Sequence, residues 1–182
     1  SLGCGEGALE RDLRRKGVCR EVEGLDLSAA ALELARQRAA AEGLDGIAYR
    51  RADLDALELP AGRYDLALFH HSLHHVAALE RCLETVERAL LPGGTLYLDE
   101  YVGPSRDAWR PGMLAEAERV YRELPRRLRR SRRLRSPHEE DDDPSEAVRS
   151  GDILAAVAAR FEVVERRDYG GNLLAVVYPH LR

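Results

Sequence analysis

The chain has 182 residues, of which 45% are hydrophobic and 33% charged, and its net charge is -4 at pH 7. No apolar run approaches the roughly 20 residues that cross a bilayer, and the charge gives no reason to expect a nucleic-acid partner. We therefore expect a single cytoplasmic domain over residues 1–182, with Cys4, Cys19 and Cys82 reduced and no membrane contact.

Short apolar segments alternate with helical patterns along most of the chain, which predicts an α/β fold with a mostly parallel sheet and helices on both faces. The last two strands, separated by "GG", are predicted to be antiparallel because two residues are too few for a parallel crossover. The predicted helices cover residues 6–17, 29–43, 79–90 and 152–161, and the predicted strands cover 19–28, 47–54, 64–70, 95–103, 162–169 and 172–180.

This rhythm breaks between residues 104 and 150, after the fifth strand of the predicted sheet. We expect a helical insertion there, with a helix between Pro111 and Pro125, that is either a lid over the active site or disordered. Residues 119–135 hold nine arginines and one glutamate. We interpret this run mainly as a solvated face, with an anion-binding lid or a nucleic-acid patch as less favoured readings.

Three glycines, Gly3, Gly5 and Gly7, stand at every second position directly before the first predicted helix. Glycine permits backbone angles closed to other residues and lets a ligand approach closely. Asp26 ends the next predicted strand, about where nucleotide-binding α/β folds keep a carboxylate for ribose hydroxyls. Glycine loop and carboxylate together predict a nucleoside site.

The spacing "GCGEG" resembles the first motif of class I S-adenosylmethionine-dependent methyltransferases, and the resemblance continues through "GLDLS", "RADLDAL", "YDLALFHHSLHHV" and "LLPGGTLYLDEY". It implies a Rossmann-like fold with a reversed last strand, and S-adenosylmethionine as cofactor. Within it, Asp26 would hold the ribose, Leu27 and Leu54 would pack against the adenine, and Asp53 would accept from the adenine amino group. The cofactor-binding residues it implies are Gly3, Cys4, Gly5, Gly7, Asp26, Leu27, Asp53, Leu54, Phe69 and His70.

The chain departs from the family pattern at Ser1, where the family usually has Asp or Glu to hold the methionine part of the cofactor. We expect a weaker or water-mediated contact there. The first strand, normally central in the sheet, is almost absent from the sequence. We therefore expect a poorly stable fragment whose neighbouring strands lose ladder partners.

Four histidines lie within "HHSLHH", and His71 and His75 have the i, i+4 spacing of a helical zinc site. We expect no metal, because no carboxylate or cysteine ligand lies nearby in the sequence. His74 and His75 are the candidate catalytic residues, since a histidine suits proton removal from a hydroxyl or amine near neutral pH.

The segment after the fifth strand should point Glu100 and several larger side chains toward the mouth of the site. The candidate substrate-binding residues are Tyr101, Arg106, Trp109 and, with less support, Arg149.

The resemblance implies methyl transfer by in-line displacement to a small or medium acceptor whose identity the sequence does not give. Two other functions stay open. One is a non-catalytic S-adenosylmethionine-binding module that regulates a partner. The other, less favoured, is a nicotinamide-dependent oxidoreductase, for which the chain lacks the GxGxxG spacing.

Overall fold

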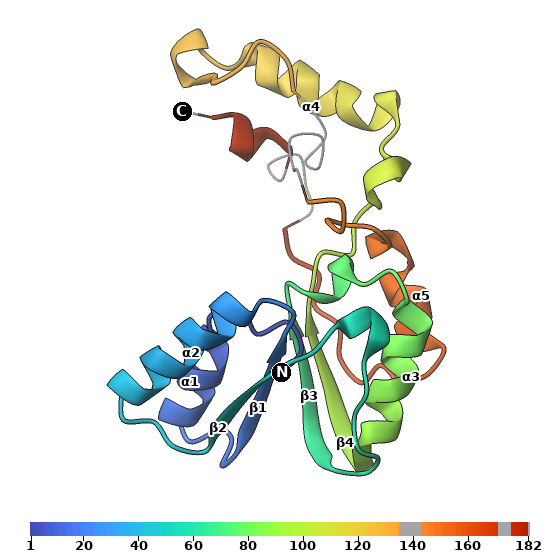
Figure 1. Cartoon of the computed structure of the whole chain (residues 1–182). Coiled ribbons are helices and arrows are strands. Elements are labelled where there is room, and N and C mark those ends of the chain that lie inside the picture. The colour runs from blue at the N-terminus through green and yellow to red at the C-terminus, as the bar shows by residue number, and fades with distance from the viewer. Residues whose placement is uncertain (135–142, 171–175, 182) are drawn as a thin grey trace.

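The computed structural model describes residues 1–134, 143–170 and 176–181 of the chain. Four parallel strands form two pairs, β1 (Val22–Asp26) with β2 (Ile47–Arg51) and β3 (Tyr64–His70) with β4 (Leu90–Asp99). Figure 1 shows α1 (Ala8–Arg15) and α2 (Ala29–Ala41) on one side of the strands, and α3 (Leu79–Ala89) and α5 (Ile153–Ala158) on the other. The predicted α/β class with parallel strands is therefore confirmed.

The two strand pairs are joined by the segment that leads into the glycine loop. Leu2 forms parallel bridges to Leu25 in β1 and to Phe69 in β3, and its amide donates to the carbonyl of Leu68 at 2.9 Å. Apolar side chains that include Leu25, Leu66 and Val86 line a cavity next to Leu2. Leu2 is therefore a point at which the two strand pairs meet.

The helices form where the sequence places caps and apolar spacing. Ser28 caps α2 by accepting a hydrogen bond from the amide of Ala31, and Leu32 and Ala35 bury one face of the helix against Tyr49. In α3, Leu79, Leu83 and Val86 are fully buried and, like Phe69, belong to the main core. Each such buried leucine contributes about 1.5–3 kcal/mol of hydrophobic free energy, so this face holds α3 to the sheet.

The prediction of an antiparallel strand over residues 162–169 is wrong. The segment has no regular structure, and its Val163 and Val164 side chains are 53% and 85% exposed. Among the described residues, it pairs with no strand. Of the predicted returning strand, residues 171–175 lie outside the described residues, and the chain is helical through Val176, Val177 and the turn Tyr178–His180.

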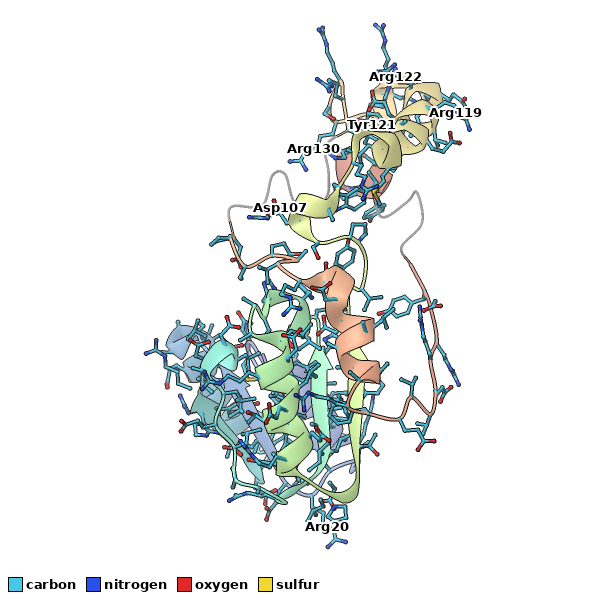
Figure 2. All side chains as sticks on the ribbon, turned by 90° about the vertical axis from the view of Figure 1, so that its right-hand side faces the viewer. Arg20, Asp107, Arg119, Tyr121, Arg122 and Arg130 are labelled. Atoms are coloured by element: carbon cyan, nitrogen blue, oxygen red, sulfur yellow. The ribbon has the colours of Figure 1, made fainter. Side chains whose placement is uncertain are left out.

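The insertion contains α4 (Pro111–Glu123), as predicted from its two prolines, and α4 has a core of its own. Ala117 and Tyr121 pack with Val176 and Val177 near the C-terminus. The Tyr121 hydroxyl donates to the carbonyl of His180 at 2.9 Å. Figures 1 and 2 show α4 and the described residues near the C-terminus beyond one end of the strands. This is the end at which β3 and β4 finish, at His70 and Asp99.

The arginines of α4 make local ion pairs, which agrees with the solvated-face interpretation. Arg119 pairs with Glu116 at 2.6 Å and with Glu123 at 2.8 Å, and Arg122 pairs with Glu118 at 2.9 Å. Figure 2 shows Arg119 and Arg122 at the far end of the molecule from the strands. Within the described ranges, no helix combines the length and the apolarity required to cross a membrane.

Candidate functional site

The glycine loop connects Leu2 to α1, and Asp26 at the end of β1 holds it in place. The amide of Gly5 donates to Asp26 Oδ2 at 2.7 Å, and the amide of Ser28 donates to Asp26 Oδ1 at 2.8 Å. Each carboxylate oxygen of Asp26 therefore spends one lone pair on the backbone and keeps a second for a ligand. The structure brings together the loop and the acidic residue that the sequence analysis paired.

The glycines have different physical roles. A Cβ on Gly3 would overlap the Cβ of Ser72, and one on Gly7 would overlap the Tyr49 hydroxyl, so these two positions are closed by protein packing. Gly5 has a φ of 52° and nothing within 4 Å of where its Cβ would lie. The open face of the loop, where a ligand can approach the backbone, is therefore at Gly5.

A hollow of about 480 Å³ lies along the loop, the first residues of α1 and His70. This volume is within the range typical of small-molecule sites. Glu10, which lines the hollow, is fully buried, and neither of its carboxyl oxygens has a hydrogen-bond partner among the described residues. A buried carboxyl group without a partner is costly and favours a ligand that carries positive charge or N–H donors.

These features fit S-adenosylmethionine, which carries an ammonium group, a sulfonium and ribose hydroxyls. Leu27 is 58% exposed beside Asp26, as a residue that packs against a bound ring must be before the ligand arrives. Asp53 is exposed, and its Oδ1 accepts from the amide of Asp55 at 2.9 Å. Leu54 is half-buried against the core. The roles that the resemblance implies for these three residues stay predictions.

Two of the expected cofactor-binding residues differ in their surroundings. His70 is exposed and lines the hollow with Gly3, Cys4 and Gly5. Phe69 is fully buried in the main core, where it lies next to Leu2. Its side chain packs the sheet together, so the structure does not support direct contact between the Phe69 ring and the cofactor.

The second part of the site is a histidine pair in the turn Leu73–His75, which follows β3. His74 is buried, and its Nδ1 lies 2.7 Å from Oε2 of Glu100. The other oxygen of Glu100 accepts the amides of Ser72 at 2.6 Å and Leu73 at 2.7 Å. A carboxylate only accepts, so Nδ1 of His74 is the protonated nitrogen of the ring.

His75 is the more accessible of the two, with its side chain 35% exposed. Its Nδ1 lies 3.1 Å from the hydroxyl of Ser145, near the end of the insertion. Glu146, the next residue, places Oε2 at 3.5 Å from Nε2 of His74 and at 3.5 Å from Nε2 of His75. The insertion therefore contributes directly to the histidine site.

Burial lowers the pKa of His74, but the hydrogen bond and charge of Glu100, together with Glu146, outweigh it. The pKa of His74 is consequently raised above its ordinary value of 6.5.

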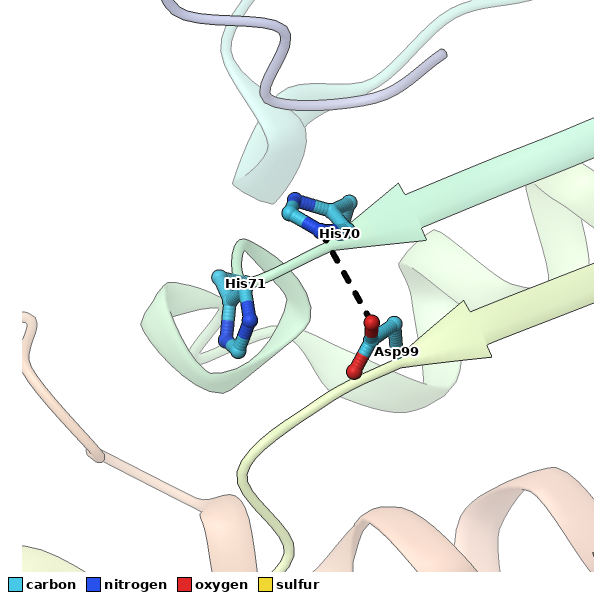
Figure 3. Close-up of side chains that lie close together, drawn as sticks. All are labelled: His70, His71 and Asp99. Atoms are coloured by element: carbon cyan, nitrogen blue, oxygen red, sulfur yellow. Dashed lines mark ion pairs between the residues drawn. The ribbon is translucent and has the colours of Figure 1, made fainter. Parts of the chain in front are cut away.

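The other two histidines of "HHSLHH" lie apart from this pair. Figure 3 shows His70 and His71 at the end of β3 beside Asp99, which ends β4, with His70 Nε2 3.7 Å from Asp99 Oδ2. Both rings are exposed, and Asp99 also accepts a hydrogen bond from Tyr169. The four histidines of "HHSLHH" thus lie in two different environments.

Two of the predicted substrate-binding residues lie beside the histidine site. The Tyr101 ring is 6.5 Å from the His74 ring in an edge-on arrangement, and its hydroxyl donates to the carbonyl of Pro104 at 3.1 Å. Burial raises the pKa of Tyr101 to about 12, against a smaller opposing effect of Trp109. Arg106 is half-buried, and its amide donates to the carbonyl of Ala147 at 2.9 Å.

Arg149, the fourth predicted substrate-binding residue, is engaged by acidic side chains of the protein itself. Its guanidinium makes a bidentate pair with Glu80 at 2.6 Å, and its Nε donates to Asp152 at 2.9 Å. These bonds tie the end of the insertion to α3 and occupy the guanidinium fork. The role of Arg149 in substrate binding stays a prediction.

Sequence reasoning missed Glu10 and Glu146 and placed Glu100 at the mouth of the site. Glu146 is far from the histidines in sequence, within a run of acidic residues that gave no reason to single it out. Glu100 directly follows β4, and its side chain is only 1% exposed because it caps the turn that carries His74. Only the fold shows these pairings.

Comparison with known proteins gives concordant results. A family model described as a methyltransferase domain matches residues 1–98. The demethylmenaquinone methyltransferase of Thermus thermophilus is 32% identical over 108 residues, which cover 59% of this chain and 49% of that protein. A ubiquinone biosynthesis O-methyltransferase of Sinorhizobium fredii is 31% identical over 148 residues, covering 80% of this chain and 56% of that protein.

Among solved structures, an S-adenosylmethionine dependent methyltransferase from Mesorhizobium loti has 42% identity and a TM-score of 0.51. The match covers 61% of this chain and 51% of that one. The chain spans about half the length of the curated relatives it matches.

Proposed function

Because the chain belongs to the class I S-adenosylmethionine-dependent methyltransferase family, we propose that it binds this cofactor at the glycine loop and methylates a small acceptor. S-adenosylmethionine is the methyl donor of the family. The observation that carries the proposal is the bond between the Asp26 carboxylate and the amide of Gly5, beside the open face of the loop.

The residues around the loop suit each part of the cofactor. Asp26 would accept the ribose hydroxyls with its remaining lone pairs, while Leu27 and Leu54 would pack against the adenine and Asp53 would accept from its amino group. At the position where the family usually has a carboxylate that holds the methionine part of the cofactor, this chain has Ser1. Glu10 lines the same hollow with its carboxyl group buried, and a side-chain rotation that exposes this group would let it take over the contact.

The bound sulfonium supplies an electrophilic methyl group, so the chain mainly has to position the acceptor and exclude water. In the transfer, the acceptor oxygen forms a bond to the methyl carbon as the carbon–sulfur bond breaks, with its electron pair left on sulfur. The acceptor also loses a proton. The pair His74 and His75 is placed to receive it at Nε2, since both Nδ1 atoms face oxygen partners.

The surroundings of the histidine pair favour an aromatic acceptor methylated at a hydroxyl. Tyr101 and Trp109 are half-buried aromatic side chains, and the Tyr101 ring lies against His74. Two of the relatives are named for quinone biosynthesis, which is consistent with a small aromatic compound. In this proposal, the described parts of the insertion, residues 104–134 and 143–150, form a lid that contributes Ser145 and Glu146 to the acceptor side.

Calorimetric titration with S-adenosylmethionine, S-adenosylhomocysteine and NADH tests the cofactor assignment. We expect saturable binding of the first two, none of NADH, and at least about tenfold weaker binding in Asp26→Ala, because a hydrogen bond to a charged group contributes about 1.5–3 kcal/mol. Asp65→Ala, an exposed aspartate away from the loop, is the control. If the folded chain binds neither adenosyl compound, the proposed function is refuted.

A further inference from the structure

We propose that His74, His75 and Glu146 form a binding site for one divalent transition-metal cation of the zinc class. Their potential ligand atoms lie within 4.8 Å of one another. The pattern "LHH" supplies two of them, and no carboxylate or cysteine lies close enough in the sequence to predict the third. The fold supplies that ligand from 71 residues further along the chain than His75.

The distances suit a tetrahedral metal. Two ligand atoms that each lie 2.0–2.1 Å from a tetrahedral zinc are about 3.4 Å apart. Oε2 of Glu146 is 3.5 Å from Nε2 of His74 and 3.5 Å from Nε2 of His75. At this separation the atoms make poor hydrogen bonds, and both distances are close to the value expected for two ligands of one cation.

Both histidines are oriented as metal ligands usually are. A metal-bound imidazole typically donates its other N–H to a carboxylate or another oxygen, which fixes the ring and its tautomer. Nδ1 of His74 is held by Glu100 at 2.7 Å, and Nδ1 of His75 faces the Ser145 hydroxyl at 3.1 Å. The Ser145 hydroxyl in turn donates to Asp143 at 2.7 Å. The Nε2 lone pairs of both histidines therefore remain available to bind the same cation.

The backbone also holds Glu146 in place. Ala147 is fully buried with a φ of 53°, a left-handed conformation that is uncommon for a residue other than glycine. Its carbonyl accepts from Arg106, and the amide of Val148 donates to the carbonyl of His74 at 3.1 Å. The strained residue next to the proposed ligand persists because the surrounding bonds fix it.

The donor set selects the metal. Two imidazoles and one carboxylate suit zinc and its neighbours better than magnesium or calcium, which prefer oxygen ligands. Three protein ligands also leave a fourth position, as in catalytic rather than structural zinc sites. This last step rests on the proposed function: an acceptor hydroxyl would occupy the fourth position. The cation would lower the pKa of that hydroxyl, in place of direct proton transfer to a histidine.

The second group of histidines serves as an internal comparison. His70, His71 and Asp99 also lie close together (Figure 3), but both rings are exposed and Asp99 is engaged by Tyr169. No buried carboxylate orients these rings in the described part of the structure. A metal that bound histidines nonspecifically would not distinguish the two groups.

The test uses the whole chain, stripped with a chelator and dialysed against zinc, with bound metal measured by elemental mass spectrometry. Cobalt substitution, read by visible absorption, reports a tetrahedral nitrogen and oxygen environment. We expect one zinc per chain, at least about 100-fold weaker binding in His75→Ala and Glu146→Gln, and about tenfold weaker binding in Ser145→Ala. The matched control, His71→Asn, keeps the left-handed backbone position and should bind zinc as the unmodified chain does.

Circular dichroism of each metal-free variant shows whether it is folded, and both ligand variants change side chains that are at least partly exposed. The inference is overturned if the folded chain holds no stoichiometric zinc, or if His71→Asn reduces binding as strongly as His75→Ala. Titration of metal-free Glu146→Gln with S-adenosylhomocysteine separates the two proposals. Retained cofactor binding with lost zinc supports the metal site, whereas lost cofactor binding in every metal-free form refutes the proposed function alone.

Discussion

The carboxylate of Glu100 accepts a hydrogen bond from Nδ1 of His74 at 2.7 Å, and its side chain is almost completely buried. This pair joins the end of β4 to the turn after β3. It fixes which ring nitrogen of His74 carries the proton and which nitrogen faces Glu146. The chemistry of the histidine site therefore depends on a residue that does not itself face the ligand.

Replacement of Glu100 by Gln tests this positioning role. The amide oxygen can still accept from the backbone, but its NH2 group would face Nδ1 of His74 and reverse the tautomer. We expect nitrogen NMR to show the proton moved to Nε2, and zinc affinity to fall about 10- to 100-fold. A variant that lost stability but kept the original tautomer would show that Glu100 is only a packing residue.

Alanine substitutions in the glycine loop should separate effects on stability from effects on cofactor binding. In Gly3→Ala the new methyl group overlaps Ser72, and in Gly7→Ala it overlaps Tyr49, in both cases at a positive φ. We expect each to lose about 2–5 kcal/mol of stability in chemical denaturation. Gly5→Ala meets no atom and should lose only about 1–2 kcal/mol from backbone strain, while its affinity for S-adenosylhomocysteine falls. Equal stabilities of the three variants would contradict this division.

Glu10 is expected to favour ligand binding at the expense of stability. Glu10→Leu removes a buried carboxyl group without a described hydrogen-bond partner, so the free energy of unfolding should rise by about 1–3 kcal/mol. Affinity for S-adenosylmethionine should fall, because the ammonium group loses its acidic neighbour. Asp12→Asn, which lines the same hollow with salt-bridge partners, is the control and should change neither quantity strongly. A less stable Glu10→Leu variant would show that the carboxyl group has a stabilising partner.

The pair of Arg149 and Glu80 predicts a specific acid dependence of stability. The hydrogen bonds from Arg149 lower the pKa of Glu80 from 4.5 to about 2. Because the folded-state pKa is below the unfolded one, this pair stabilises the fold fully above pH 4.5 and loses its effect as the pH falls toward 2. The Glu80 side chain is 58% exposed, so the contribution is at most about 1 kcal/mol.

Urea denaturation of Arg149→Met and of the unmodified chain between pH 3 and pH 6 measures this contribution. The difference between them should be largest at pH 6 and shrink as the solution is acidified. Acceptor selectivity should be unchanged in the variant, because Arg149 ties the insertion to α3. A changed selectivity with unchanged stability would instead support Arg149 as a substrate-binding residue.

The sequence predicted the elements whose signals are local. The Ser28 cap and alanine-rich run marked α2, the leucine spacing marked α3, and Pro111 marked the start of α4. The pairing of the glycine loop with Asp26 also followed from spacing alone. Each of these depends on residues close together in the chain.

Other features depend on contacts between distant residues and could not be read from such patterns. The apolar residues of segment 162–169 suggest a strand, but the segment pairs with no strand in the described structure. Arg149 looks like any arginine near an active site until Glu80 is placed beside it. Glu146 is a candidate ligand only because the fold places the end of the insertion beside His74.

The place of Glu146 in the chain has a consequence for proteolysis. The amide of Gly5 and the carboxylate of Asp26 lie outside the insertion, whereas Glu146 lies within it and reaches Nε2 of His74 and of His75 at 3.5 Å. A protease that cut the insertion and released Glu146 would therefore disrupt the histidine site and leave the nucleoside site intact. Limited digestion would then yield a form that still holds the cofactor but no longer assembles the histidine site.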